Sequence, residues 1–420
     1  MKKLLTWIGR IFAFLFSLLA LIAVGIGIWV LFQPSLDDAS NKLNDEFLLS
    51  DEYRALADSS LKNAQELSQQ MELPSLSIAV GINDELIWAA AIGYADIKNE
   101  QANDLQTVYR SGSVSKSMTG LAAAKLSEQG RLDLDAPISQ YIDVLKDKRW
   151  DPLLRELASH TGGIRHYSSP GHPSFVSEQL SKKHYNSVEE SLPIFVNDSL
   201  LFEPGTSFRY STHGFTLLSA AMEKGAGQNY LDMVEELVWK PAGMEQTRPD
   251  DLTIGQPNRI TPYIKFAGHF INLEGPDPSY KWAGGGILST PSDLVKMGGA
   301  FMNAEIVSQG TADPVFIPQA LKDASPNPDG YAMGWRNTKE TELMNSEEEI
   351  RTMHHGGASP GGSSFLLILP DDTLSVAVMS NVSLANSWPL REYAFKVAAR
   401  FREHEAAKEE TQAQLLSQDN

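Results

Sequence analysis

The longest apolar segment of the chain lies close to its N-terminus. Residues 11–32 are 22 consecutive positions without a charged side chain. As a helix they would extend about 33 Å, which is enough to cross the hydrocarbon of a bilayer. Cations precede the segment and aspartates follow it: Lys2, Lys3 and Arg10 on one side, Asp37 and Asp38 on the other. The positive-inside rule therefore predicts a cytoplasmic N-terminus and an exported domain.

A cleaved signal peptide is the alternative interpretation of this segment. The apolar part of a signal peptide usually has about 7–15 residues and ends in a small-x-small cleavage site. Here the apolar run is longer and ends in Trp29-Val-Leu-Phe. We therefore predict an uncleaved anchor in the inner or cytoplasmic membrane, with the domain in the periplasm or outside the cell.

Two pairs of strand-like runs lie towards the two ends of the remaining chain. Each pair is separated by turn residues, which is typical of β-hairpins. The pairs are Ser75–Ile82 with Leu86–Tyr94 and Ser363–Leu369 with Leu374–Ser380. Helical patterns such as Val114–Leu126 and loops rich in Pro and Gly lie between them. The pattern predicts an α+β fold, with an antiparallel sheet built from both ends of the domain, flanking helices and an inserted helical subdomain.

The same patterns define the predicted organisation of the chain. In chain order, we predict a cytoplasmic N-terminus at 1–10, an anchor at 11–32, a polar spacer at 33–70, a domain at 71–405 and a tail at 406–420. Within the domain, residues 71–112 and 276–405 would form the sheet-containing part and residues 113–275 the helical part. A final amphipathic helix fits Pro389–Arg402. The charged tail lacks a core pattern and is predicted to be disordered.

The composition excludes several classes of site. A net charge of −18 without a basic cluster argues against a nucleic-acid partner. The chain has no cysteine, which removes thiol catalysis, disulfides and cysteine-bound metals. Its 9 histidines include no His-Glu-x-x-His segment. We therefore do not expect a catalytic metal.

Two Ser-x-x-Lys segments offer a candidate nucleophile. Ser59 and Lys62 lie in the polar segment, where a lysine would stay hydrated and protonated. Ser113 and Lys116 open an apolar helix, and their spacing of just under one turn puts both on one helix face. A serine hydroxyl needs a neighbouring base, and a lysine becomes one only if its pKa is lowered. We predict Ser113 as nucleophile and Lys116 as base, against the alternative of an N-cap serine beside a surface lysine.

A different nucleophile motif occurs later in the chain. Gly357-Ala-Ser-Pro-Gly361 matches the Gly-x-Ser-x-Gly elbow. That elbow requires a strand before the serine and a helix after it. Here a proline and a strand-like run follow the serine, so we reject this motif.

Three further segments carry groups that suit acyl transfer. Tyr210-Ser211-Thr212 offers a tyrosine for proton transfer. His354-His355-Gly356-Gly357 precedes a predicted strand, and a histidine there can bind a substrate carboxylate. The glycines let a backbone N–H approach the substrate carbonyl as an oxyanion donor. A glycine-rich segment at 282–294 lies between the other two.

The order of these motifs resembles that of the serine β-lactamases and penicillin-binding proteins. Their signature is Ser-x-x-Lys, Tyr-x-Asn and Lys/His-x-Gly. The chain is most similar to the branch with class C β-lactamases, D-aminopeptidases, esterases and, closest, mitochondrial serine β-lactamase-like proteins. The resemblance covers about residues 70–402 and rests on the segments 158–167, 210–212, 279–290 and 354–357. It implies a β-lactamase/transpeptidase-like fold.

The resemblance also implies roles for individual residues. Ser113 would be acylated, Lys116 would be its base, and Tyr210 would carry a proton to the leaving group and help activate the deacylating water. His354 stands where many members have lysine. The N–H groups of Ser113 and Gly357 would form the oxyanion hole, next to Gly356. No metal or cofactor is implied.

Two departures from the family pattern bear on the substrate. Thr212 replaces the usual asparagine, whose amide commonly contacts a substrate amide, and His354 replaces lysine. A charge at His354 would change near about pH 6–7. Thr212 therefore argues against the usual β-lactam hydrolysis. The resemblance to the mitochondrial serine β-lactamase-like proteins, which are linked to peptide hydrolysis and filament formation, implies a peptidase before an esterase or a β-lactamase, with a small peptide, ester or β-lactam-like substrate.

A function of another class stays open beside the enzyme. The chain could be a non-hydrolytic penicillin-recognising protein or a membrane scaffold that forms homo-oligomers or filaments. Thr212 and the predicted anchor favour this alternative, whereas the joint presence of Ser113, Lys116 and Tyr210 argues against it. Turnover that depends on Ser113 would distinguish the two.

Overall fold

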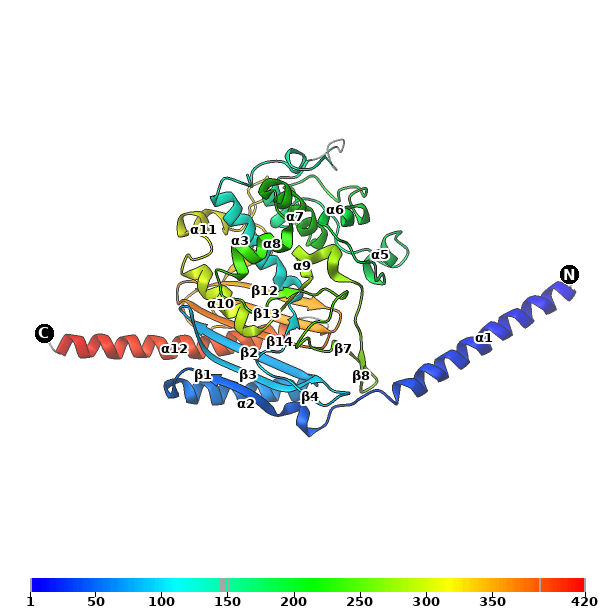
Figure 1. Ribbon diagram of the computed structural model, residues 1–420, viewed down its shortest axis with the longest axis horizontal. Helices are drawn as coiled ribbons and strands as arrows, with labels where there is room; N and C mark the ends of the chain where they lie inside the picture. Colours follow the sequence, from blue (N-terminus) through cyan, green and yellow to red (C-terminus); the bar gives the residue numbers. More distant parts are fainter. Residues whose placement is uncertain (1, 144–148, 150, 385–386, 419–420) are drawn as a thin grey trace.

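The computed structural model describes residues 2–143, 149, 151–384 and 387–418 (Figure 1). Its centre is a 9-stranded antiparallel sheet in the order β1-β3-β2-β14-β13-β12-β11-β10, with β4 paired to β3. The strands are β1 (Leu43–Leu48), β2 (Ser75–Ile82), β3 (Glu85–Asp96), β4 (Gln101–Ala102), β10 (Tyr331–Ala332), β11 (Trp335–Glu340), β12 (Ile350–Ser359), β13 (Gly362–Leu369) and β14 (Leu374–Ser380).

The sheet joins the two ends of the domain, as the sequence pattern predicted. Both predicted hairpins form, as β2–β3 and β13–β14. Their inner strands then pair with each other, with Ile82 opposite Leu374 at one end and Ser77 opposite Met379 at the other. The α+β prediction is therefore confirmed.

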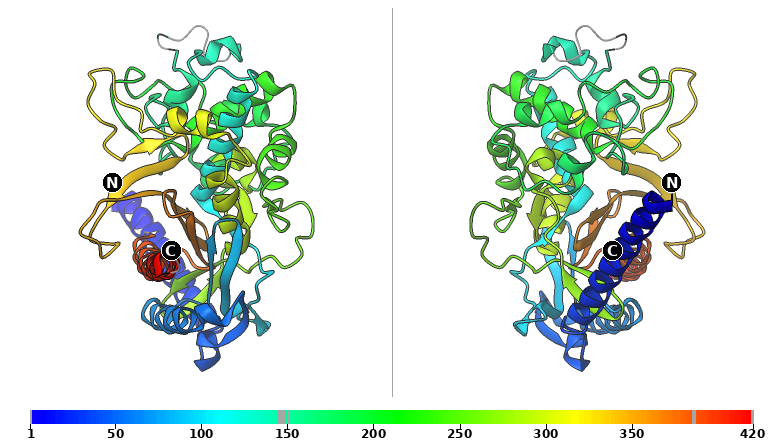
Figure 2. Two further views of the ribbon diagram at one scale, coloured as in Figure 1. Left: turned by 90° about the vertical axis from the view of Figure 1, so that its left-hand side faces the viewer. Right: turned by 90° about the vertical axis from the view of Figure 1, so that its right-hand side faces the viewer.

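Both faces of the sheet are apolar and covered by helices. Alternate strand residues point to opposite faces. Leu366 and Ile368 of β13 lie in a core with the helical region, which includes α3 (Ser115–Glu128) and α10 (Pro291–Met302). Leu367 and Leu369 lie in a second core with α2 (Arg54–Met71) and α12 (Trp388–Gln418). Figures 1 and 2 show these two helical layers on either side of the strands.

The segment between the two halves of the sheet is mainly helical and carries short strands as well. Its further helices are α4 (Leu154–Ala158), α5 (Phe175–Gln179), α6 (Val188–Ser191), α7 (Thr212–Ala226), α8 (Tyr230–Val234), α9 (Trp282–Gly285) and α11 (Gln309–Val315). β5 (Tyr109–Arg110), β9 (Ile287–Ser289) and β6 (Arg248–Pro249) form a small sheet, and β7 (Tyr263–Phe266) pairs with β8 (His269–Asn272). The stretch predicted as helical, 113–275, therefore also contains β6, β7 and β8.

The prediction of a polar spacer at 33–70 is wrong. β1 pairs with β3 and forms one edge of the central sheet. α2 packs Ala57 and Ala64 into the core, where α12 also lies. This buried side of α2 consists of alanine and serine. It therefore lacks the stripe of large apolar residues by which a core helix is usually recognised in a sequence.

The prediction of a disordered tail at 406–420 is also corrected. α12 continues to Gln418, well beyond the predicted end at Arg402. Its last part is exposed and consists mostly of Ala, Glu, Gln, Lys and Leu, without Gly or Pro. These residues have high helix propensity, so the helix extends past the surface on which its first half packs.

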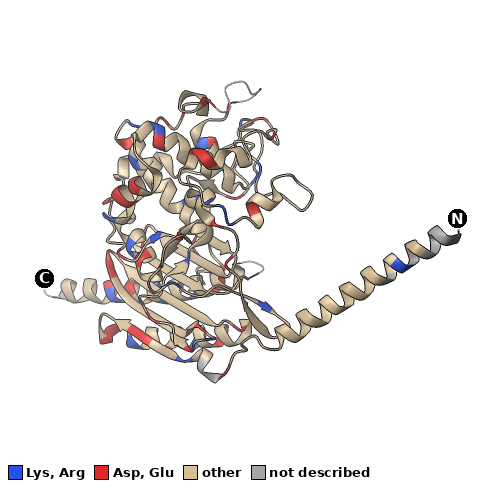
Figure 3. Ribbon diagram, turned by 45° about the vertical axis from the view of Figure 1, so that its right-hand side comes forward, with Lys and Arg blue, Asp and Glu red and all other residues tan. Residues whose placement is uncertain are grey.

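α1 (Lys2–Val30) leaves the body of the molecule as a separate rod. Its segment Arg10–Val30 is long and apolar enough to cross a membrane, and Figure 3 shows it without charged residues apart from its N-terminal end. The chain that follows α1 is held by β8. The Phe270 N–H donates to the Pro34 carbonyl at 2.8 Å, and His269 Nδ1 lies 2.9 Å from the Gln33 carbonyl.

Gly120 lies where α3 meets the turn between β10 and β11. A methyl group there would overlap the carbonyl oxygen of Met333. Because backbone yields less easily than a side chain, we expect Gly120→Ala to lower the free energy of unfolding by at least about 1–3 kcal/mol. Denaturant unfolding would measure this. Gly310→Ala is the control, since nothing lies within 4 Å of the added methyl, and equal midpoints for the two variants would contradict the expectation.

Candidate active site

Ser113 lies between a short strand and the central helix. β5 leads through Ser111 into a 3₁₀ turn, Gly112–Val114, and α3 follows directly. Gly112 has φ of +51°, a left-handed conformation that glycine adopts without strain. A methyl group on Gly112 would also lie 2.8 Å from the Ala358 nitrogen of β12. Glycine at this position therefore lets the loop before Ser113 approach β12.

Lys116 is fully buried beneath Ser113. Its Nζ lies 2.6 Å from the carbonyl oxygen of Gly284 at the end of α9, 3.1 Å from Thr212 Oγ1 and 3.2 Å from Ser113 Oγ. The fold thus brings together the predicted nucleophile, the predicted base and Thr212. Gly284 was not assigned a role from the sequence, although it lies in the glycine-rich segment.

The surroundings of Lys116 favour its neutral form. Burial lowers the pKa of this amine well below its ordinary value, and the positive charges of Lys281 and Arg336 lower it further. A neutral amine has two N–H groups and one lone pair. If the N–H groups donate to Gly284 and Thr212, the lone pair remains for the Ser113 hydroxyl. This is the arrangement that a general base requires.

Tyr210 lies beside this pair. Lys116 Nζ is 4.9 Å from the centre of the Tyr210 ring. Burial raises the pKa of the Tyr210 phenol, and a hydrogen bond with Ser113 opposes this only in part. The phenol therefore stays protonated at neutral pH, so it can donate a proton and does not offer a phenolate.

Two histidines of the segment 158–167 hold the backbone after Tyr210. The Ser211 N–H donates to His160 Nδ1 and the Thr212 N–H donates to His166 Nδ1, both at 3.1 Å. The His160 ring also packs against the Tyr210 ring, with centres 4.2 Å apart. Burial lowers the pKa of His166 to about 3. Both rings are therefore neutral supports of the Tyr210 loop, a role that the sequence did not reveal.

The structure corrects the prediction for His354. Paired residues of neighbouring antiparallel strands share a face. His354 pairs with Leu367 and therefore lies on the α12 face, where its ring stacks on Phe365. His355 pairs with Leu366 and lies on the helical-region face, near Tyr210. Both histidines border the cleft, but His355 is the one that approaches the candidate catalytic residues.

His355 is a neutral structural residue. Its Nδ1 lies 2.7 Å from the Gly356 carbonyl and therefore carries the proton, while Nε2 lies 2.7 Å from the Tyr331 hydroxyl and accepts from it. Burial, and then the charge of Arg336, lower the pKa of His355 well below its ordinary value. Burial also lowers the pKa of His354 to about 3. Neither histidine therefore carries a positive charge at neutral pH.

Gly356 and Gly357 are consecutive residues of β12 and face opposite sides of the strand. A methyl group on Gly357 would overlap the Ser111 carbonyl oxygen, so this position touches the nucleophile loop. A methyl group on Gly356 would instead overlap the Ser387 side chain. β11 covers β12 only as far as His354. Beyond it, β12 has a backbone edge without a partner strand among the described residues. Ala358, which was not predicted, is the residue of β12 whose nitrogen would lie closest to a methyl group on Gly112.

These residues line a cleft of about 800 Å³. One side is formed by Tyr210, Thr212 and Lys281, and the other by β12 and the start of α12. A pocket of this size accommodates a small organic ligand or a few residues of a peptide.

A buried ionic network fixes the strand that carries the nucleophile loop. Arg110 Nε donates to Asp250 at 2.7 Å and Arg110 Nη1 donates to the Pro360 carbonyl at 2.6 Å. Arg259 pairs with Asp250 and Glu274. Arg110 therefore ties β5, just before Ser113, to the turn after β12.

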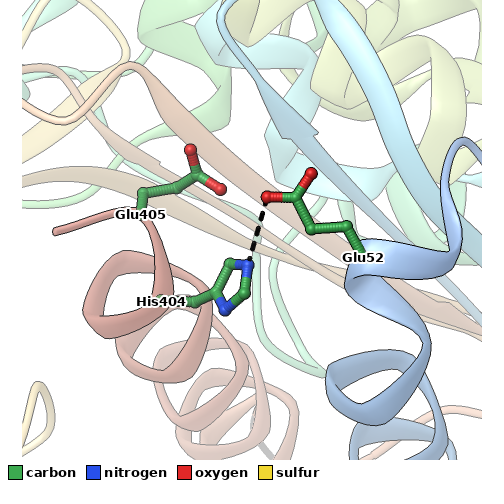
Figure 4. Close-up of side chains that lie close together, drawn as sticks. All are labelled: Glu52, His404 and Glu405. Atoms are coloured by element: carbon green, nitrogen blue, oxygen red, sulfur yellow. Dashed lines mark ion pairs between the residues drawn. The ribbon is translucent and has the colours of Figure 1, made fainter. Parts of the chain in front are cut away.

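Outside the cleft, Glu52, His404 and Glu405 come together between the turn Asp51–Tyr53 and α12 (Figure 4). Such donors can bind a metal. Here His404 Nε2 lies 3.6 Å from Glu52, and the ammonium of Lys408 lies 2.8 Å from the same carboxylate oxygen. Because a cation already neutralises Glu52, we interpret this cluster as a link between the N-terminal segment and α12.

The other nucleophile motifs lie outside the cleft or in the wrong geometry. Ser59 and Lys62 are exposed residues of α2. Ser359 ends β12 and is followed by a turn and β13, without a helix. The rejection of the Gly-x-Ser-x-Gly elbow is therefore confirmed.

Comparison with known proteins gives a consistent assignment. The serine beta-lactamase-like protein LACTB, mitochondrial, of Mus musculus is 29% identical over 403 residues, covering 75% of this chain and 73% of that protein. Among solved structures, EstCE1, a hydrolase with promiscuous acyltransferase activity, has a TM-score of 0.69 at 22% identity and covers 82% of this chain and 100% of its own.

A class C β-lactamase has a TM-score of 0.67 at 18% identity, over 84% of this chain and 97% of its own. These structures share the β-lactamase/transpeptidase fold with this chain. A sequence profile of the family described as Beta-lactamase matches residues 62–396, which include every strand of the central sheet except β1 and the whole cleft. The chain therefore belongs to the β-lactamase family of serine hydrolases.

Proposed function

We propose that this protein hydrolyses small peptides through an acyl-enzyme on Ser113. The observation that carries the proposal is the buried Lys116 amine, which lies 3.2 Å from the Ser113 hydroxyl and has a lowered pKa. A buried lysine that only stabilised the fold would be expected to form an ion pair. Lys116 instead contacts the Ser113 hydroxyl, the Thr212 hydroxyl and the Gly284 carbonyl oxygen.

The acylation step follows from this geometry. Ser113 Oγ attacks the substrate carbonyl carbon while its proton passes to Lys116 Nζ. The carbonyl oxygen becomes an oxyanion, and the N–H of Ser113 and a backbone N–H of β12 would receive it. The second donor would come from Gly357, the predicted residue, or from Ala358, since both line the cleft.

Release of the leaving group requires a proton donor. The neutral phenol of Tyr210 gives its proton to the leaving nitrogen as the carbon–nitrogen bond breaks, and the Lys116 ammonium restores it. In deacylation, water attacks the ester carbon of the acyl-Ser113 while one of its protons passes, through the Tyr210 hydroxyl, to the neutral Lys116 amine. The bond between this carbon and Ser113 Oγ then breaks, and the Lys116 ammonium returns the proton to Oγ. Thr212 keeps Lys116 oriented throughout, because its Oγ1 lies 3.1 Å from Nζ.

The open edge of β12 supports a peptide substrate. An extended peptide can add to an unpaired strand edge through main-chain hydrogen bonds. In the described part of the chain, β12 has no strand partner on this side beyond His354. A peptide bound there would place a carbonyl carbon near Ser113. We therefore favour a peptidase over an esterase or a β-lactamase of the same family.

α1 supports a membrane location for this activity. We propose that it anchors the protein in the cytoplasmic membrane with the domain on the outer side, because cations precede the apolar segment and acidic residues follow it. Protease protection of inside-out and right-side-out vesicles would test the orientation.

Intact-protein mass spectrometry tests the proposed function directly. Wild type and Ser113→Ala would each be incubated with a fluorophosphonate, a penicillin and a mixed library of D- and L-peptides. We expect a mass adduct on wild type only, and the reagent that forms it would distinguish peptidase, esterase and β-lactamase. If no reagent forms an adduct, the proposal fails and a non-hydrolytic scaffold becomes the better interpretation.

A further inference from the structure

Lys281 is a buried cation in the wall of the cleft. It ends the 3₁₀ turn Pro278–Lys281, directly before α9, and is 7% exposed. Its ammonium lies 5.2 Å from the ring centre of Tyr167 and 5.4 Å from that of Tyr280. Among the residues that the structure describes, no carboxylate oxygen lies within 4.0 Å of it. Its charge is therefore met only by aromatic rings.

The other cations of the cleft are engaged. Arg336 pairs with Asp329 at 2.7 Å, and Arg391 pairs with Glu340 at 2.5 Å. Lys116 is held by hydrogen bonds beneath Ser113. Lys281 is thus the cleft cation that has neither a carboxylate partner nor a hydrogen-bond acceptor within the described residues.

The histidines of β12 cannot supply a positive charge for a substrate. Both ring nitrogens of His355 are occupied, by the Tyr331 hydroxyl and the Gly356 carbonyl. His354 lies on the opposite face of the strand, against Phe365. Neither histidine therefore offers a positive charge to a substrate carboxylate, the role that the sequence assigned to His354.

An unpaired ammonium in a largely buried wall is costly. Removing it from water without a counter-ion is unfavourable, and contact with two aromatic rings compensates only in part. A substrate carboxylate that entered the cleft would supply the missing partner. A charge-assisted hydrogen bond of this kind contributes about 10- to 100-fold in affinity.

We propose that Lys281 binds a carboxylate of the substrate, so that the cleft selects anionic substrates. This rests on the proposed function, because it names the substrate class of the same site. Lys281 also lowers the pKa of Lys116 by repulsion between like charges. A variant at Lys281 would therefore change the rate with every substrate, and only a comparison of matched substrates isolates recognition of the carboxylate.

Two pairs of esters provide that comparison with the full-length protein in detergent. p-Nitrophenyl glutarate and its methyl ester differ by a carboxylate in the acyl group. 3-Acetoxybenzoate and its methyl ester differ by a carboxylate in the leaving group. We expect wild type to prefer the acid in at least one pair by about 10- to 100-fold in kcat/KM. Lys281→Met should reduce this ratio to near one, and Lys281→Arg should retain most of it.

The surface variant Lys339→Met is the matched control, because Lys339 is exposed and pairs with Glu349. It should keep the wild-type ratio. A ratio near one for both pairs in wild type, or a ratio unchanged in Lys281→Met, would overturn the proposal while leaving the hydrolase intact. If wild type hydrolyses none of the esters, the proposed function fails, and calorimetric titration with glutarate and dimethyl glutarate still decides: equal affinity for the two would refute the role of Lys281.

Discussion

Ser113→Ala is expected to lower the rate of hydrolysis by about 10⁴- to 10⁶-fold. The remaining rate would be that of hydrolysis in the cleft without a nucleophilic side chain. Without Oγ there is no atom to form the acyl-enzyme, and Lys116 loses the hydroxyl that it activates. The substitution removes one half-buried oxygen, so the fold should be unaffected. Steady-state hydrolysis of an activated ester, with circular dichroism as a check of folding, measures the effect.

The chain offers a matched control for this variant. Ser59 occupies the same position in the other Ser-x-x-Lys segment, on the exposed surface of α2. Ser59→Ala should hydrolyse at the wild-type rate. Substantial turnover by Ser113→Ala would show that another nucleophile is used and would refute the acyl-enzyme at this residue.

Lys116→Ala is expected to lower the rate by about 10²- to 10⁴-fold, the usual contribution of a positioned general base. Lys116→Arg should be similarly impaired, since a guanidinium stays protonated and has no lone pair for the Ser113 proton. Lys62→Ala, at the equivalent position of the exposed segment, should retain full activity. Near-normal rates in both Lys116 variants would contradict the assignment of the base.

The same base predicts the pH dependence of the wild type. Burial lowers the pKa of Lys116, so the amine is neutral and active above that lowered pKa and becomes protonated as the pH falls through it. We therefore expect kcat/KM to decrease on acidification. A rate that stays flat from neutral pH down to about pH 4 would be incompatible with Lys116 as the base, provided that the protein remains folded.

The sequence predicted the sheet because both of its hairpins are local. β2–β3 and β13–β14 each consist of two apolar runs around a short turn, and such a pattern is readable within about twenty residues. α2 was not recognised as a core helix because it packs through alanine and serine. These residues are common both on surfaces and in cores, so they do not indicate burial. β1 was not predicted as a strand because its residues, LNDEFL, include charged side chains, which a half-exposed edge strand tolerates.

The candidate site was predictable where spacing along one helix determines geometry. Ser113 and Lys116 are three residues apart on successive turns, so local structure alone brings them together. The choice between His354 and His355 depends on which face of β12 each side chain occupies, and a shift of one residue exchanges the faces. Lys281 could be recognised only from the absence of a carboxylate neighbour, which is a property of the folded molecule.

The pairing of β2 with β14 affects how the chain folds during synthesis. Ile82 is made about 300 residues before its partner Leu374. At a translation rate of about 5–20 residues per second, β2 waits roughly 15–60 s for its neighbour. Throughout that interval an apolar strand edge is unprotected, and such edges promote aggregation. Efficient production of this protein should therefore depend on holdase chaperones that shield the first hairpin until the C-terminal strands emerge.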